Sequence, residues 1–178
     1  GVKLLDVLDI HWYPTEKTYE DRINWHRVFF DTTYVYPGAN GIKKVNGGWD
    51  NSIVKEFIFQ RLNDWMNAYF GKNHGIGLGL TETDLTTDDA MLTALIYASF
   101  LGTFMDNGVE LFTPWSWGDG MDEVAHLFIR YGHEFRVAST SSNDSLVSAY
   151  SSVTESQDSM TIILVNRSEK MSQTVNLS

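Results

Sequence analysis

Cysteine is absent from this sequence of 178 residues. Its absence excludes a disulfide framework, a thiolate zinc site and a thiol nucleophile. Positive charge is also scarce: 13 Lys and Arg stand against 23 Asp and Glu, for a formal net charge of −10. An acidic surface repels phosphates, so we expect no nucleic acid partner. No apolar run approaches the roughly 20 residues that span a bilayer, so we expect no membrane partner either.

The first residues, Gly1-Val2-Lys3, lack both an initiator methionine and a signal peptide. We therefore expect the chain to be part of a longer polypeptide whose upstream segment carried any targeting information. Metal-ligand spacing is missing as well, since the histidines share no such spacing and no acidic loop matches a calcium-binding pattern. The sequence predicts neither a metal nor a cofactor.

Aromatic residues, in contrast, are abundant, at 13% of the chain with 6 Trp, 8 Tyr and 10 Phe. This is more than a core of this size needs, and rings on loops suit ligands with flat apolar faces such as sugars. Many of these rings fall between Thr15 and Gly48, a stretch expected to be one long loop. Trp25 within it and Trp49 directly after it suit either packing or a glycan cleft, whereas Trp65 follows an apolar helical stripe further on and is expected in the core.

Three strand–loop–helix units are expected in succession. The strands are predicted at Leu4–Ile10, Gly75–Thr81 and from Val109 into the loop at Trp117; the helices at Asn51–Tyr69, from Thr86–Asp89 to about Met105, and at Met121–Tyr131. Residues 50–52 are candidate caps for the first of these helices, and Gly71 is expected to end it. Repeated units of this kind predict parallel strands covered by helices, an α/β fold.

The tail after Ser139 has a different character. Leu146–Tyr150 and Met160–Val165 are rich in β-forming residues, and Thr174–Leu177 is expected to begin a further strand. No helix intervenes, so these strands should be antiparallel. A domain boundary is expected between about Arg136 and Leu146.

Candidate functional residues gather where the parallel strands end. The carboxyl ends of such strands meet at one face, where chemistry usually takes place. These ends carry the triplet His11-Trp12-Tyr13, then Glu82 in "GLGLTETD", then Trp115 and Trp117. A carboxylate among aromatic rings is typical of a carbohydrate site, because an oxocarbenium-like transition state needs a nearby negative charge.

The segments "LLDVLDIHWYP", "DTTYVYPGAN", "GLTETD" and "WSWG" resemble the second half of glycoside hydrolase family 44, which contains β-1,4-glucanases and xyloglucanases. The resemblance implies an α/β fold comprising about strands 6–8 of a (β/α)8 TIM barrel, in residues 1–138, followed by part of an antiparallel β-sandwich, in residues 139–178. The family usually follows the glutamate of strand seven with Tyr-Asn, where this chain has Thr83-Asp84.

The same resemblance implies the roles of the site residues. Glu82 is the nucleophile of a retaining mechanism, and the acid/base glutamate lies upstream of Gly1, since the chain contains no Asn-Glu-Pro. Tyr13 is the better candidate to bond the nucleophile, and His11 shapes the adjoining subsite. Trp12 is assigned either to substrate or to the core, and one or both of Trp115 and Trp117 to a sugar-facing wall.

We therefore expect a fragment of a secreted, extracellular or periplasmic endo-β-1,4-glycanase, inactive without its missing N-terminal half. Its substrate would be a polysaccharide such as a β-glucan or xyloglucan. Two alternatives stay open: a non-catalytic glycan-binding module, and a barrel hydrolase of other specificity such as an agarase.

Overall fold

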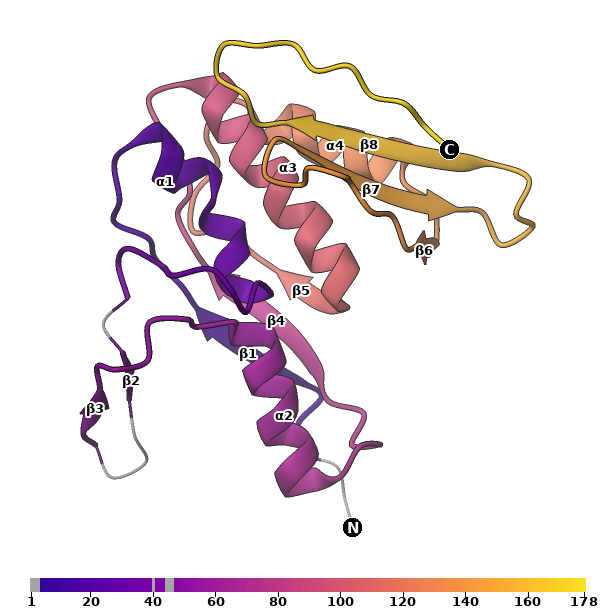
Figure 1. Ribbon diagram of the computed structural model, residues 1–178. Coiled ribbons are helices and arrows are strands. Elements are labelled where there is room, and N and C mark those ends of the chain that lie inside the picture. The colour runs from indigo at the N-terminus through magenta and orange to yellow at the C-terminus, as the bar shows by residue number, and fades with distance from the viewer. Residues whose placement is uncertain (1–3, 40, 44–46) are drawn as a thin grey trace. The chain divides into compact units, whose positions relative to one another are not determined.

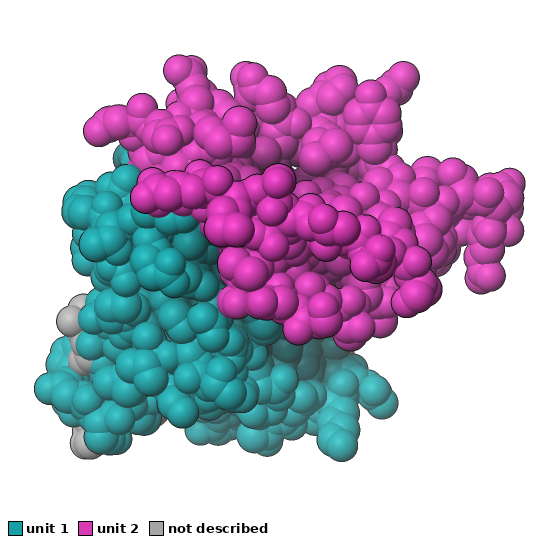
Figure 2. Space-filling model, turned by 45° about the horizontal axis from the view of Figure 1, so that its top comes forward, with its two compact units in different colours: residues 1–85, 107–116 teal, residues 86–106, 117–178 magenta. Residues whose placement is uncertain are grey.

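A computed structural model describes residues 4–39, 41–43 and 47–178 of the chain (Figure 1). The expected start at Gly1-Val2-Lys3 lies outside the described residues. The chain forms two compact units, coloured separately in Figure 2. Unit 1 comprises residues 1–85 and 107–116, and unit 2 comprises residues 86–106 and 117–178.

Unit 1 is built on a parallel sheet. Its strands are β1 (Val7–His11), β4 (Gly77–Glu82) and β5 (Val109–Phe112), in the order β1-β4-β5. Both pairings are parallel, as the strand–loop–helix pattern predicted. Leu78 and Leu80 on the central strand β4 are buried and anchor the strand. The last residue of β4, Glu82, lies at the end of the sheet.

The stretch from Thr15 to Gly48 contains regular structure, so the expectation of a single long loop was wrong. Its elements are α1 (Tyr19–Ile23), the 3₁₀ helix η1 (Trp25–Phe29) and the strand β2 (Ile42–Lys43), which pairs with β3 (Trp49–Asp50). Thr18 begins α1 by accepting a hydrogen bond from the backbone N–H of Asp21. Short helices held by caps and buried aromatic rings carry no long periodic signal, so the sequence pattern did not reveal them.

Helix α2 (Ile58–Phe70) begins seven residues later than predicted. Asp50 accepts hydrogen bonds from the backbone and hydroxyl of Ser52 and closes a turn there, instead of capping a helix. Phe57 has a φ of 24°, outside the helical region, so the helix starts only after it. Gly71, with a φ of 83°, ends α2 as predicted.

Trp65 corrects a second expectation about α2. It was expected in the core, but its side chain is 48% exposed. The guanidinium of Arg61 lies 5.5 Å from the centroid of its ring, one turn earlier on the helix. The buried face of α2 is instead formed by Ile58, Phe59 and Met66.

Unit 2 contains two helices and an antiparallel sheet. The helices are α3 (Ala90–Asn107) and α4 (Met121–Tyr131); the strands are β6 (Phe135–Val137), β7 (Val147–Val153) and β8 (Met160–Asn166). The carboxylate of Asp89 accepts hydrogen bonds from the backbone of Met91 and Leu92, so the predicted cap of α3 is confirmed. The predicted bounds of α4 are confirmed as well.

The sheet β6-β7-β8 is antiparallel throughout, as predicted. Residues 174–177 form no strand, however, so the expected last strand was wrong. Helix α3 packs on this sheet at Gly102, where an added Cβ would lie 2.3 Å from the ring of Tyr150. Gly102 is therefore needed for close approach of helix and strand.

In the part of the chain that the structure describes, the fold is thus mixed α/β, with a three-stranded parallel sheet, a three-stranded antiparallel sheet and the two-stranded sheet β2-β3. Helices α3 and α4 group with the antiparallel sheet, a grouping that the sequence did not predict, while the division at residue 138 stays a prediction. Among the described residues, no helix has both the length and the apolar character needed to cross a membrane.

Candidate active site

The register of β1 and β4 brings His11 beside Glu82. The pairing runs regularly from Val7–Gly77 to Ile10–Leu80, and a shift after Ile10 then makes His11 the partner of Glu82. The backbone N–H of Trp12 continues the pairing by donating to the carbonyl of Glu82, at 3.0 Å. The segment His11-Trp12-Tyr13, at the end of β1 and the start of its loop, therefore lies beside the end of β4.

Two side chains contact one oxygen of the Glu82 carboxylate. The hydroxyl of Tyr13 donates a hydrogen bond to Oε2 at 3.0 Å, and Nδ1 of His11 lies 3.2 Å from the same atom. The other oxygen, Oε1, has no hydrogen-bond partner within the part of the chain that the structure describes. The side chain of Glu82 is 34% exposed, so this oxygen belongs to a carboxylate that solvent and ligands can reach.

Asp9 and Thr81 extend this polar row, and the sequence reasoning missed them. Nε2 of His11 lies 3.9 Å from Oδ2 of Asp9, which also accepts a hydrogen bond from Thr81 at 2.5 Å. Asp9 precedes His11 by two positions, so the twofold period of a strand places both on one face. That period is the signal by which Asp9 could have been found.

The electrostatic coupling between Tyr13 and Glu82 is visible in the pKa of the phenol. Partial desolvation raises the pKa of Tyr13, and the hydrogen bond to Glu82 and the negative charges of Glu82 and Asp84 raise it further. Tyr13 therefore stays protonated at neutral pH and keeps donating to the carboxylate.

We expect Glu82→Gln to move the pKa of Tyr13 down toward its ordinary value. The negative charge of Glu82 disfavours a phenolate, and a neutral amide does not. Labelling tyrosine with ¹³C at Cζ and titrating the chain by NMR would measure this. Asp64→Asn, which changes an exposed carboxylate on α2, is the matched control and should leave the pKa of Tyr13 unchanged. Equal titration curves in Glu82→Gln and the unsubstituted chain would contradict the coupling.

The environment of Trp12 differs from that of its neighbours His11 and Tyr13. Only 9% of its surface is exposed, and its ring packs against Trp25, Phe29 and Tyr36 at centroid distances of 6.4, 5.3 and 5.5 Å. Of the two roles expected for it, the structure favours the core. Its ring holds the His11-Trp12-Tyr13 segment in place while the flanking side chains face Glu82.

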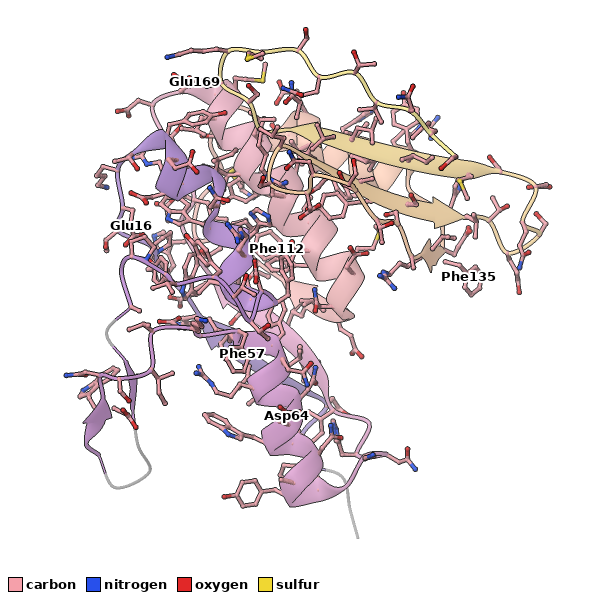
Figure 3. All side chains as sticks on the ribbon, viewed as in Figure 1. Glu16, Phe57, Asp64, Phe112, Phe135 and Glu169 are labelled. Atoms are coloured by element: carbon pink, nitrogen blue, oxygen red, sulfur yellow. The ribbon has the colours of Figure 1, made fainter. Side chains whose placement is uncertain are left out.

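Glu16, which is labelled in Figure 3, joins two members of this aromatic cluster. Its Oε2 accepts hydrogen bonds from Tyr36 at 2.8 Å and from the indole of Trp25 at 3.0 Å. Burial alone would raise the pKa of Glu16, but these hydrogen bonds favour its charged form and leave the pKa below its ordinary value.

A carboxylate with a lowered pKa contributes stability above its unfolded pKa, and that contribution is lost as the pH falls through the folded value. We therefore expect Glu16→Gln to lower the free energy of unfolding by about 1–2 kcal/mol at pH 7. The difference from the unsubstituted chain should shrink on acidification below about pH 4. Urea unfolding at pH 7 and at about pH 3 measures the free energy of unfolding of both proteins. An equal difference at the two pH values would contradict the prediction.

The two remaining predicted site residues lie in different units. Trp115 belongs to unit 1, where its backbone N–H donates to the carbonyl of Thr83 at 2.9 Å, and its side chain is 67% exposed. Trp117 belongs to unit 2, is 64% exposed, and lines a cavity there. The structure thus brings together His11, Tyr13 and Glu82, and leaves both tryptophan rings open to solvent.

Among the described residues, no group of three or more His, Cys, Asp or Glu side chains could hold a metal ion. The chemistry available at this site is that of a reachable carboxylate held at one oxygen by a phenol and an imidazole. Such an arrangement serves nucleophilic attack or stabilisation of a cationic transition state.

Among known proteins, the chain is similar to parts of proteins that bear the names of glycoside hydrolases. The chain is 25% identical to a β-mannanase/endoglucanase A of Caldicellulosiruptor saccharolyticus, over all of this chain and 15% of that protein. It is 24% identical to endoglucanase A of Paenibacillus lautus, over 94% of this chain and 26% of that protein. No protein-family model matches the sequence.

Solved structures of glycoside hydrolase family 44 are also similar to this chain. A family 44 endoglucanase from Clostridium thermocellum matches 92% of this chain with 27% identity and a TM-score of 0.72. A Paenibacillus polymyxa xyloglucanase of family 44, solved with xyloglucan, matches 92% with 22% identity and a TM-score of 0.73. The chain spans only 35% of the length of each. The resemblance of the motifs to part of glycoside hydrolase family 44 is thereby confirmed.

Proposed function

We propose that this chain carries the nucleophile of a retaining endo-β-1,4-glycanase. In this proposal β1, β4 and β5 are strands six to eight of a (β/α)8 barrel whose other strands lie outside these 178 residues. The antiparallel sheet of unit 2 is part of a β-sandwich. The domain division at residue 138 belongs to the same proposal.

The observation that carries the proposal is the asymmetric environment of the Glu82 carboxylate. Its Oε2 is held by Tyr13 and His11, while Oε1 has no hydrogen-bond partner among the described residues. A carboxylate nucleophile needs one oxygen oriented by the protein and the other free to attack carbon. A buried structural carboxylate would instead be expected to use both oxygens in hydrogen bonds, whereas the side chain of Glu82 is 34% exposed.

In the proposed reaction Oε1 of Glu82 attacks the anomeric carbon as the glycosidic bond breaks. A carboxylic acid outside this chain, about 5–5.5 Å from Glu82, protonates the leaving oxygen. Water then hydrolyses the covalent glycosyl-enzyme, with the same acid now acting as base, and the anomeric configuration is retained. The hydrogen bond from Tyr13 orients the carboxylate of Glu82 for this attack.

A neutral β-glucan or xyloglucan is the proposed substrate. The acidic net charge of −10 suits an uncharged polymer, and similar proteins bear the names endoglucanase and xyloglucanase. A polysaccharide cannot enter a cell intact, so the protein is proposed to act outside the cytoplasm. The reaction requires no cofactor.

The test is covalent trapping in the longer protein that we propose contains this chain. A 2-deoxy-2-fluoro-β-cellobioside with a dinitrophenyl leaving group needs no protonation of that group, and the fluorine slows turnover of the intermediate. Peptide mass spectrometry should then find the sugar on Glu82. Labelling of a different carboxylate, or of Glu82→Gln to the same extent, would overturn the assignment.

A non-catalytic glycan-binding module is the second candidate, and the exposed indoles of Trp115 and Trp49 favour it. Incubation with carboxymethylcellulose and xyloglucan separates the two functions. Binding without release of reducing ends would establish the module, and cleavage of agarose in their place would establish a hydrolase of galactans.

A further inference from the structure

Unit 2 contains a cavity of about 490 Å³ that the proposed catalytic residues do not line. Its volume falls within the range of about 300–1,000 Å³ that is usual for small-ligand sites. The cavity lies between the start of α3, the loop after Trp117 and the first turn of α4. It is lined by Ala90, Met91, Ala94, Trp117, Gly118, Asp119, Gly120, Asp122 and Glu123.

Two glycines give the cavity its shape. An added Cβ on Gly120, whose φ is 93°, would lie 2.2 Å from the carbonyl oxygen of Ala90, and one on Gly118 would lie 2.7 Å from Thr86. The loop can therefore approach the start of α3 this closely only with glycine at position 120, where a Cβ would meet backbone. This close approach holds Trp117 at the rim while its ring stays 64% exposed.

The lining combines an aromatic face with hydrogen-bond acceptors. The exposed indole of Trp117 and the exposed thioether of Met91 provide apolar surface. The carboxylates of Asp119, Asp122 and Glu123 accept hydrogen bonds but donate none when ionised. None of the described Lys, Arg and His residues lines the cavity. The lining is thus suited to a ligand that has a flat face of C–H bonds, several O–H donors and no negative charge.

We propose that this cavity is an accessory subsite for one pyranose unit of a neutral glycan, and that its carboxylates exclude uronic acid chains. The proposal rests on the proposed glycanase function for the choice of a β-glucan. The C–H face of the sugar stacks on the indole of Trp117, since such bonds are attracted to the negative face of the ring. Its hydroxyls donate to Asp119, Asp122 and Glu123, and Met91 adapts to the side of the ring.

The experiment is NMR titration of the 178-residue chain with cellotetraose and with a xyloglucan oligosaccharide. We expect shifts of the Trp117 indole and Met91 methyl signals, with smaller shifts at the start of α4. Trp117→Ala should weaken binding about tenfold or abolish it. Asp122→Asn should weaken it severalfold, since a neutral amide accepts a weaker hydrogen bond than a carboxylate.

Matched controls are Tyr131→Ala and Glu134→Gln, an exposed aromatic residue and an exposed acidic residue of unit 2 outside the cavity. Both should bind as the unsubstituted chain does. An oligogalacturonate of the same length should produce no shifts. The proposal is overturned if neither neutral oligosaccharide moves these signals at about 10 mM, a concentration that detects weak sugar binding. It is also overturned if the oligogalacturonate binds equally, or if only calcium ions move the signals. Its failure is distinct from failure of the catalytic assignment, which is read from the covalent label on Glu82.

Discussion

Replacing Glu82 by glutamine is expected to reduce hydrolysis of xyloglucan and carboxymethylcellulose by at least about 10³-fold in the protein that carries this chain with its proton donor. The amide has nearly the same shape, but it has no negative charge and is a poor nucleophile. Tyr13 and His11 can still contact it, so the fold should survive. The loss should therefore appear in kcat, with unfolding of the variant close to that of the unsubstituted protein.

Chemical rescue makes this prediction sharper. In Glu82→Gly the missing carboxylate leaves space for a small anion, and added azide should attack the anomeric carbon in its place. The product should be a glycosyl azide of inverted configuration, because one displacement replaces two. Reducing-end assays measure the loss, and NMR of the product gives the configuration.

Glu155→Gln, in the exposed turn between β7 and β8, is the matched control and should keep full activity. Retention of more than about a tenth of the activity in Glu82→Gln would show that this carboxylate is not the nucleophile. An azide product of retained configuration would contradict a direct displacement.

The second large effect is expected at Arg167, which follows β8 and is 4% exposed. Its guanidinium donates to the hydroxyls of Ser99, Ser148 and Tyr150 at 3.2, 2.5 and 3.2 Å, and to the carbonyl of Asp144 at 2.6 Å. These contacts join α3 to β7, β8 and the turn before them. One side chain thus satisfies polar groups from separate parts of unit 2.

We expect Arg167→Met to lower the free energy of unfolding by about 3 kcal/mol, because several buried acceptors lose their donor at once. For a chain of this length the midpoint of thermal unfolding should fall by about 6–12 °C. Arg167→Lys should recover only part of the loss, since an ammonium group cannot reach acceptors in several directions as the planar guanidinium does.

Thermal unfolding followed by circular dichroism measures both variants. Arg130→Met, an exposed change on α4, is the control and should shift the midpoint by less than about 2 °C. A shift equally small in Arg167→Met would show that the buried network contributes little to stability.

Several elements of the fold were predictable because local signals agreed with the tertiary structure. The acidic cap at Asp89, the glycine at position 71 and the periodicity of residues 121–131 each gave the right helix boundary. The parallel pairing of β1, β4 and β5 followed from the alternation of strands and helices.

The failures share a cause, which is competition from contacts distant in sequence. Phe57 adopts a conformation incompatible with a helix, so α2 starts late although its apolar pattern extends further back. Trp65 fits the apolar stripe, yet Ile58, Phe59 and Met66 form the buried face. Residues 174–177 have strand-forming composition but no strand pairs with them in the structure.

The sequence by itself determined that Glu82 would stand at the end of a strand, with His11 and Tyr13 at the end of another, because apolar alternation and turn residues are local properties. Only the tertiary structure decided that a register shift after Ile10 aligns His11 with Glu82 and that Trp12 is buried among aromatic rings. It also placed Trp117 in the lining of a cavity that Glu82 does not line. Strand register and side-chain packing depend on contacts between residues far apart in the chain, and those contacts exist only once the chain has folded.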